Sequence, residues 1–220
     1  MPVTNQQKSL VLTAVISLVV VVAWFTPFMW PFKILVVYFH EMSHVVATYL
    51  TGGQVVEFSL NVMQGGHVVS IGGNRFITLS AGYLGSLGWG LAFLWAASNT
   101  RHDRYITGAI GIMMCLTPLL GTSVGVTIIL LAFGLAFLAL ARFTGHFWND
   151  LVLRCLGIVS MIYVPLDIIS DTLLRSYARS DARMLAEEFG GATILWGGIW
   201  LLISLWVLKI AIQSLLKSGR

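Results

Sequence analysis

Charged side chains are scarce in this 220-residue chain, at 10% of all residues, whereas a soluble domain carries about 25%. Hydrophobic residues make up 57% of the chain, and its mean hydropathy is +0.86. This composition excludes an ordinary soluble globular protein. It predicts a multi-pass protein integral to the lipid bilayer, with residues 1–220 forming a single membrane domain.

Paired cysteines and clusters of basic residues are also missing. Cys115 and Cys155 both fall in apolar runs, without metal-ligand spacing to a second cysteine. A disulfide within the bilayer would need a close approach of two helices, so we expect two free thiols. The formal net charge of +4 comes from a few residues in loops and at the termini, as is usual at membrane surfaces. We therefore expect no nucleic-acid partner.

The chain contains instead a series of apolar runs long enough to cross a bilayer. They cover residues 10–30, 34–50, 79–98, 105–121, 122–141, 148–174 and 192–214. The second run is short for a full span, and the fourth and fifth meet at a Gly-Thr-Ser segment that indicates a tight hairpin. The first is too long for a signal-peptide core and is interpreted as a retained helix. The pattern predicts an all-α polytopic membrane fold with six or seven transmembrane helices.

The second run carries three ionisable residues in the order His40-Glu41-Met-Ser-His44. On an α-helix the two histidines lie one turn apart on one face, so both imidazoles can bind one Zn²⁺. In this pattern Glu41 serves as the general base for the attacking water. The motif is short, but three such side chains in an apolar helix are costly unless they bind a ligand, pair or face a polar cavity. We therefore predict a zinc centre, with a purely structural polar cluster as the alternative.

Residues 51–78 depart from the helical pattern. Gly52 and Gly53 end the catalytic helix. Residues 55–63 alternate between apolar and polar, a Gln-Gly-Gly turn follows, and residues 67–71 return as a second strand. A short β-hairpin is expected here, packed on protein or at the membrane interface. It either only shapes the site or holds an unwound substrate along its edge, and substrate-binding residues stay unassigned.

The next apolar run has small residues along its faces. They repeat at four-residue spacing, as Gly82, Ser86 and Gly90, and as Ala81 and Gly85. Small faces let membrane helices approach closely. We expect this helix to pack on the catalytic helix, and contact with substrate is the alternative.

A catalytic zinc usually has three protein ligands, and the motif supplies only two. Asp167 and Asp171 are one turn apart near the end of a long apolar run, where Pro165 would loosen the helix. Asp167 lies deeper in the apolar stretch and is the predicted third ligand. Asp171 is the alternative, and pairing with Arg175 four residues later would be its structural role.

Other polar residues are assigned structural roles. His67 is expected on the hairpin at the rim of the site. Asn149 or Asp150 is interpreted as the N-cap of the sixth span. Ser180 or Asp181 is interpreted as the N-cap of a polar helix between the last two spans.

In this order the motifs resemble the site-2 protease family of intramembrane zinc metallopeptidases, most closely a compact branch without a PDZ-like domain. The resemblance extends from about residue 30 to about residue 200 and rests on His40-Glu41-x-x-His44, Gly52-Gly53, Gly65-Gly66, Ala81–Gly85, Leu166–Asp171 and Ser180-Asp181-Ala182. It implies that His40 and His44 bind zinc and that Glu41 is the catalytic base. Leu166-Asp167 matches the start of the family's Leu-Asp-Gly setting for the third ligand, with Ile168 in place of the glycine.

The sequence therefore predicts an intramembrane zinc metalloprotease that hydrolyses peptide bonds in or near transmembrane segments of membrane proteins. One alternative is a non-proteolytic zinc-binding membrane protein. The other is a transporter in which His40, Glu41, His44 and Asp167 line an ion pathway. Substrate, orientation and oligomeric state are left open.

Overall fold

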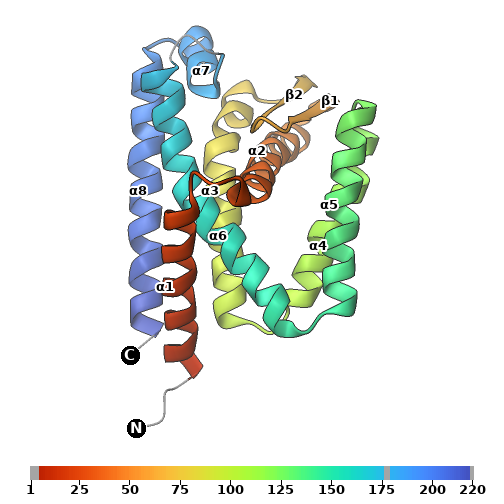
Figure 1. The fold of residues 1–220 in the computed structure, drawn as a ribbon. Coiled ribbons are helices and arrows are strands. Elements are labelled where there is room, and N and C mark those ends of the chain that lie inside the picture. The colour runs from red at the N-terminus through yellow and green to blue at the C-terminus, as the bar shows by residue number, and fades with distance from the viewer. Residues whose placement is uncertain (1–4, 176–178, 219–220) are drawn as a thin grey trace.

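The computed structural model describes residues 5–175 and 179–218, most of which are helical (Figure 1). The helices and strands follow the chain as α1 (Asn5–Ala23), α2 (Trp30–Leu50), β1 (Gln54–Asn61), β2 (Gly65–Ile71), α3 (Arg75–Asn99), α4 (Asp103–Leu116), α5 (Val124–Phe143), α6 (His146–Ile169), α7 (Asp181–Phe189) and α8 (Thr193–Ser218). Three shorter helical turns are η1 (Pro27–Met29), η2 (Thr117–Leu120) and η3 (Ser170–Leu174).

Four of the described helices are long and apolar enough to cross a membrane, namely α3, α5, α6 together with η3, and α8. The chain is thus a multi-pass membrane protein, but the prediction of six or seven spans is not confirmed. The predicted run 10–30 is broken, because α1 ends at Ala23. New helical turns then begin at Pro27 and at Pro31. Its remaining apolar helix, Ser9–Ala23, is shorter.

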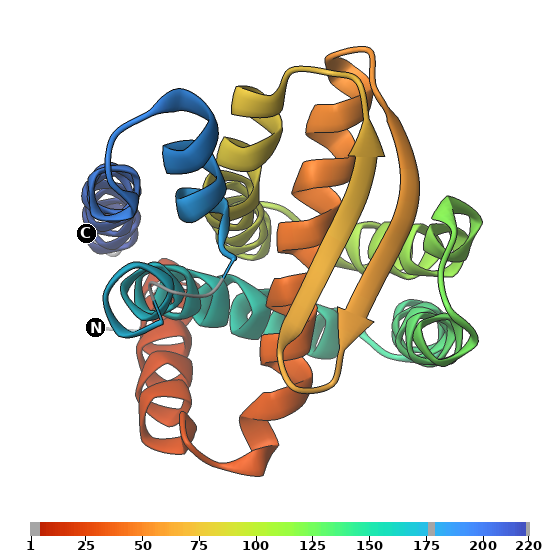
Figure 2. The ribbon, with the colours of Figure 1, turned by 90° about the horizontal axis from the view of Figure 1, so that it is seen from above.

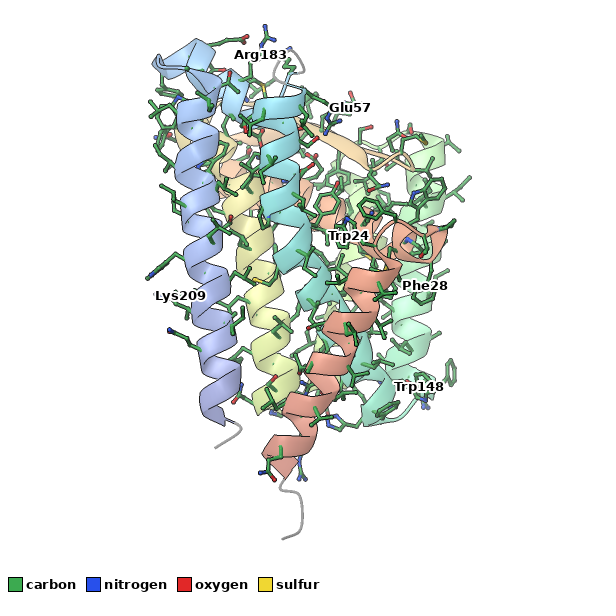
Figure 3. The ribbon with its side chains drawn as sticks, turned by 60° about the vertical axis from the view of Figure 1, so that its left-hand side comes forward. Trp24, Phe28, Glu57, Trp148, Arg183 and Lys209 are labelled. Atoms are coloured by element: carbon green, nitrogen blue, oxygen red, sulfur yellow. The ribbon has the colours of Figure 1, made fainter. Side chains whose placement is uncertain are left out.

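The hairpin and α7 lie at one end of the molecule. Figure 2, the view from above, shows the hairpin along α2, with α7 beside α3 and α8. Figure 3 places Glu57 and Arg183 at this end, whereas Trp148 lies near the opposite end and Lys209 projects outward from α8. Polar elements are therefore gathered at one end of an otherwise apolar bundle.

The predicted hairpin is confirmed. Strands β1 and β2 pair antiparallel, with Ser59 opposite His67 and an irregularity near Val55. Phe58 is fully buried in the same core as α2, and its backbone N–H donates to the carbonyl of Gly121 between η2 and α5. The outer edge of β1 is thus held by protein, and residues of β2 border the cavity described below.

Helix α3 approaches two helices closely through its glycines. A Cβ at Gly85 would meet the side chain of Ser43 in α2, and one at Gly90 would lie 2.7 Å from the Ser160 side chain in α6. The hydroxyl of Ser160 also donates to the carbonyl of Ser86 at 3.1 Å. The predicted packing of the small face on α2 is confirmed, and the same helix also packs on α6.

A buried arginine joins three helices at the end opposite the hairpin. Arg154 of α6 is 3% exposed and donates to Asp150 Oδ2 at 2.8 Å, to Thr13 Oγ1 of α1 at 2.7 Å, and to Ala97 O of α3 at 2.7 Å. Since α6 begins at His146 with Gly145 as its N-cap, the predicted capping by Asn149 or Asp150 is wrong.

Arg154→Met is expected to lower the free energy of unfolding by about 3–5 kcal/mol, because it leaves the Asp150 carboxylate buried without its partner. The measurement is thermal unfolding of the purified protein in detergent. Arg101→Met, at an exposed arginine before α4, is the matched control and should change little. A second variant, Asp150→Asn with Arg154→Met, should recover part of the loss; equal losses in the control and in Arg154→Met would contradict the expectation.

Candidate metal centre

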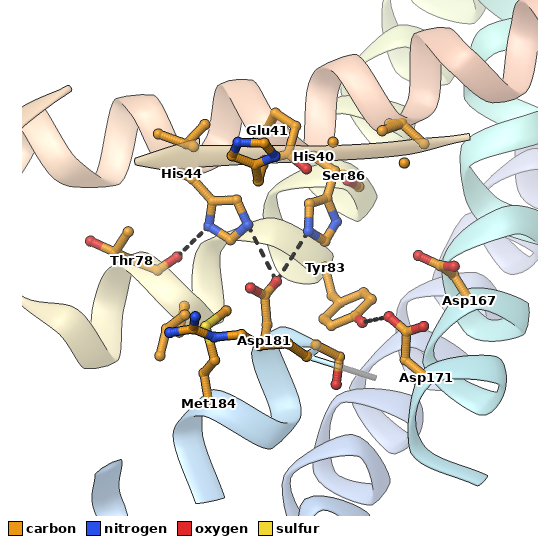
Figure 4. A pocket seen from close by; sticks show the side chains of 18 of the residues that line it. His40, Glu41, His44, Thr78, Tyr83, Ser86, Asp167, Asp171, Asp181 and Met184 are labelled. Carbon is orange, nitrogen blue, oxygen red and sulfur yellow. Dashed lines mark hydrogen bonds and ion pairs between the residues drawn. The ribbon is translucent and has the colours of Figure 1, made fainter. Parts of the chain in front are cut away.

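The two motif histidines point from one face of α2 toward α3 and α7 (Figure 4). Their ring centroids lie 4.9 Å apart. His44 Nδ1 lies 2.7 Å from the carbonyl oxygen of Thr78 in α3, so this nitrogen carries the hydrogen and donates it. The lone pair of His44 is therefore on Nε2, the atom directed at the centre.

The third polar group between the imidazoles is Asp181, the first residue of α7. Its Oδ2 atom is 3.0 Å from His40 Nε2 and 3.3 Å from His44 Nε2. Ser180 caps α7 by accepting from the backbone N–H of Arg183, as predicted for this segment. Because Ser180 provides the cap, the Asp181 carboxylate is free to face the histidines.

These three side chains form the one group of His, Cys, Asp and Glu found among the described residues whose ligand atoms could hold a metal ion, all within 4.8 Å of one another. Tetrahedral Zn²⁺ with ligands at 2.0–2.1 Å would place its ligand atoms about 3.3 Å apart. The distances from Asp181 Oδ2 to the two imidazoles are close to that value. Two imidazoles and one carboxylate are also a donor set that suits catalytic zinc. The residues therefore fit a zinc ion.

Asp167 and Asp171, the predicted third ligand and its alternative, line the same cavity but have other partners. Asp171 accepts from Tyr83 at 2.5 Å and pairs with Arg175 at 2.9 Å, as expected for its structural role. Asp167 lies 3.9 Å from Arg175. The geometry thus replaces Asp167 with Asp181 in the candidate ligand set, because α7 packs beside α3 and brings its first residue to α2.

Electrostatics favour an ionised carboxylate at the centre. Burial by itself would raise the pKa of Asp181, which is 8% exposed. The adjacent imidazoles of His44 and His40 outweigh burial and hold that pKa well below its usual value. Asp181 is therefore a negatively charged donor at neutral pH, the form in which a carboxylate binds a metal.

Glu41 lies beside this centre, under the hairpin. It is 4% exposed and lines a cavity of about 790 Å³ together with the three candidate ligands. The backbone of β2 passes so close that a Cβ at Gly66 would lie 2.7 Å from Glu41 Oε1. His67 also lines the cavity, at its rim as predicted, with a side chain that is 60% exposed. The carboxylate of Glu41 and the edge of β2 thus face the same space.

Tyr83 packs against the imidazole ring of His40. The two rings meet edge to face with centroids 4.9 Å apart, and Tyr83 is 2% exposed. Its hydroxyl donates to Asp171, which is held in turn by Arg175. Asp171 is therefore connected to His40 through Tyr83.

Gly82 leaves space for the imidazole of His40 and the carboxylate of Asp181. A Cβ at this position would lie 2.4 Å from His40 Nε2 and 2.7 Å from Asp181 Oδ2. Gly82→Ala is expected to weaken zinc binding by about 10–100-fold, the usual effect of disturbing the groups that orient ligands. The measurement is a zinc titration against a competing chelator. Gly88→Ala, in the same helix with nothing within 4 Å, is the control, and equal affinities of both variants would contradict the expectation.

Comparison with known proteins gives one match. A family model described as Peptidase M50B-like matches residues 13–211. No curated protein and no solved structure matches the chain.

Proposed function

Because the chain belongs to the Peptidase M50B-like family, membrane-embedded metallopeptidases of the site-2 protease type, we propose that it is an intramembrane zinc metalloprotease. It would hydrolyse peptide bonds in or near transmembrane segments of membrane proteins. The observation that carries the proposal is the meeting of Asp181 with His40 and His44 beside Glu41. Asp181 is 141 residues from His40 in sequence, so the packing of α7 brings this carboxylate to the motif.

In this proposal His40, His44 and Asp181 hold the zinc ion. Zinc bound there would polarise the scissile carbonyl group and lower the pKa of water toward ~7. Glu41 takes the proton of the attacking water on its carboxylate and passes it to the leaving amine. Thr78 fixes the tautomer and orientation of His44 through the 2.7 Å hydrogen bond at Nδ1.

The hairpin offers a way to hold the substrate. Strand β2 borders the cavity, and its backbone at Gly66 lies against Glu41. A locally unwound substrate segment could add to this edge by main-chain hydrogen bonds. In β1 the backbone N–H of Phe58 already donates to the carbonyl of Gly121. This contact favours β2 as the strand that binds the substrate. The scissile bond would then lie beside the Glu41 carboxylate.

Comparison of membrane proteomes from cells with the wild-type protein and with Glu41→Gln tests this function. The proposal predicts fragments cut within or next to transmembrane segments that depend on Glu41. A non-proteolytic zinc protein predicts stoichiometric zinc and identical fragments in both strains. An ion-pathway transporter, for which His40, Glu41, His44 and Asp167 do share a cavity, predicts identical fragments and an ion flux. Identical fragments, or purified protein without stoichiometric zinc, would overturn the proposal.

A further inference from the structure

A second polar cluster lies at the other end of α6, where this helix begins beside the start of α4. Asp103 and Thr107 are one turn apart in α4, and both are fully buried. His146 and Asn149 are in the first turn of α6, and Asn149 is also fully buried. His146 Nδ1 lies 2.5 Å from Asp103 Oδ2, which places the two helix ends in contact.

The rest of the α4–α6 interface is apolar. Further along α4, Ile110 and Met114 continue the stripe that begins with Thr107, and both belong to the same hydrophobic cluster as Leu153 and Leu156 of α6. The polar residues thus close one end of an apolar interface. Asp103 faces α6, because its Oδ2 atom lies 2.5 Å from His146 Nδ1, and Thr107 lies one turn further along the same face of α4.

Most of the unsatisfied buried oxygens of the described chain gather here. Five buried side-chain atoms in the described residues form no hydrogen bond, and four of them are Asp103 Oδ1, Asp103 Oδ2, Thr107 Oγ1 and Asn149 Oδ1. Of these four, Asp103 Oδ2 has an ionic partner in His146, which leaves three oxygens without a partner. The fifth is Thr48 Oγ1 in α2. Buried acceptors of this kind are costly without a donor or a cation. Both amide hydrogens of Asn149 are directed to Thr144 and Gly145, so its oxygen is left for another partner.

Asp103 is the carboxylate of this cluster that has no arginine partner, and its ionic partner is His146. The Asp150 carboxylate is neutralised by Arg154 at 2.8 Å, and Arg104 donates to two carbonyl groups of the α5 end and not to Asp103. Burial raises the pKa of the Asp103 carboxyl, although His146 opposes that rise. The carboxylate is therefore buried with one ionisable partner, His146.

A carboxylate, an amide oxygen and a hydroxyl are hard oxygen donors, the kind that alkali and alkaline-earth ions prefer over thiolate or imidazole sites. We propose that Asp103, Thr107 and Asn149 form a binding site for a hard monovalent cation of the size of sodium, which fastens α4 to α6 at the end opposite the zinc centre. A single carboxylate without an arginine partner matches a single positive charge. His146, whose side chain is 54% exposed, covers the site from outside. The site is independent of proteolysis.

The test measures thermal unfolding of the purified full-length protein in detergent at pH 8. Sodium chloride is compared with choline chloride at equal ionic strength, and potassium chloride is included for selectivity. Sodium is expected to raise the unfolding temperature by about 3–6 °C at a concentration near ten times its dissociation constant. The rise should saturate, and binding of radioactive sodium to the same preparation should saturate in the same range.

Variants locate the site. Asp103→Asn and Thr107→Val should abolish or weaken the sodium response, with Thr107→Val as the milder change if Asp103→Asn folds poorly. Thr48→Val is the matched control, since Thr48 is also fully buried and also has an unpartnered hydroxyl, but lies in α2. His146→Gln should keep the response, because His146 is not among the three proposed ligands.

The proposal is overturned if sodium, potassium and choline give the same unfolding temperature, which would mean that water alone fills the cluster. It is also overturned if sodium has no effect and His146→Gln lowers the unfolding temperature. His146 would then be the group that balances the Asp103 carboxylate. A sodium response that survives in Asp103→Asn but disappears in Thr48→Val would place the ion elsewhere.

Discussion

Glu41→Gln is expected to lower the rate constant of peptide-bond hydrolysis by about 10²–10⁴-fold, the usual contribution of a general base. Bound zinc should stay at the wild-type level. Glutamine keeps the size of the side chain under Gly66 but cannot accept the proton of the attacking water. The rate is measured in a single turnover of a detergent-solubilised transmembrane substrate, together with the zinc content of the same preparation.

Glu57→Gln is the matched control for that experiment. Glu57 lies on the hairpin with a side chain that is 53% exposed and 3.6 Å from His67. Its substitution should leave both rate and zinc content near wild type. Loss of zinc from Glu41→Gln would instead make Glu41 a ligand, and an unchanged rate would require another base.

Asp181→Ala is expected to weaken zinc binding by more than about 100-fold, beyond the range for residues that only orient ligands. The substitution leaves two imidazoles, 4.9 Å apart between ring centroids, and no carboxylate between them. Zinc affinity is measured by competition with a chelator of known affinity. Proteolysis should fall with the bound zinc and recover in part at high zinc concentration.

The two aspartates of α6 are the internal comparison. Asp167→Asn and Asp171→Asn should retain zinc within about tenfold, since their partners are Arg175 and Tyr83 and neither belongs to the candidate ligand group. If Asp167→Asn releases zinc and Asp181→Ala does not, the ligand assignment reverts to the one predicted from the sequence.

Local patterns predicted the elements around the site well. The spacing of His40 and His44 predicts a helix, and the alternation after Gly53 predicts a hairpin. Each of these signals lies within a few residues of the chain. The small face of α3 likewise predicted a close approach to α2. These features depend on neighbours along the chain, so sequence periodicity is enough to find them.

The third member of the site depends on tertiary packing. Asp181 is 141 residues from His40, and nothing local places α7 beside α3. Asp167 is the third ligand predicted from the sequence, because a carboxylate in an apolar run is costly unless it is paired or binds a metal. In the structure the side chain of Asp167 is 23% exposed and borders a polar cavity near Arg175. The available signal for Asp181 is its place in Ser180-Asp181-Ala182, one of the motifs that carry the family resemblance.

The predicted number of spans is not confirmed, for a related reason. Apolar content alone cannot show where a run is divided, and the first run is divided at Pro27 and Pro31. Lys33, just before the second predicted run, is buried and donates to the carbonyl of Trp24 at 2.8 Å across this break. The polar contact stabilises an elbow between α1 and α2 that composition does not reveal.

The placement of Asp181 on α7 also sets the order in which the enzyme is completed during synthesis. The two histidines of α2 emerge from the ribosome 141 and 137 residues before Asp181. At about 5–20 residues per second this delay is roughly 7–28 s. During that interval the nascent chain has two of the three donors of its metal centre. Under the proposed function, hydrolytic capacity would be acquired late, after α3 to α6 have been made, and a partly synthesised chain would not yet be a protease.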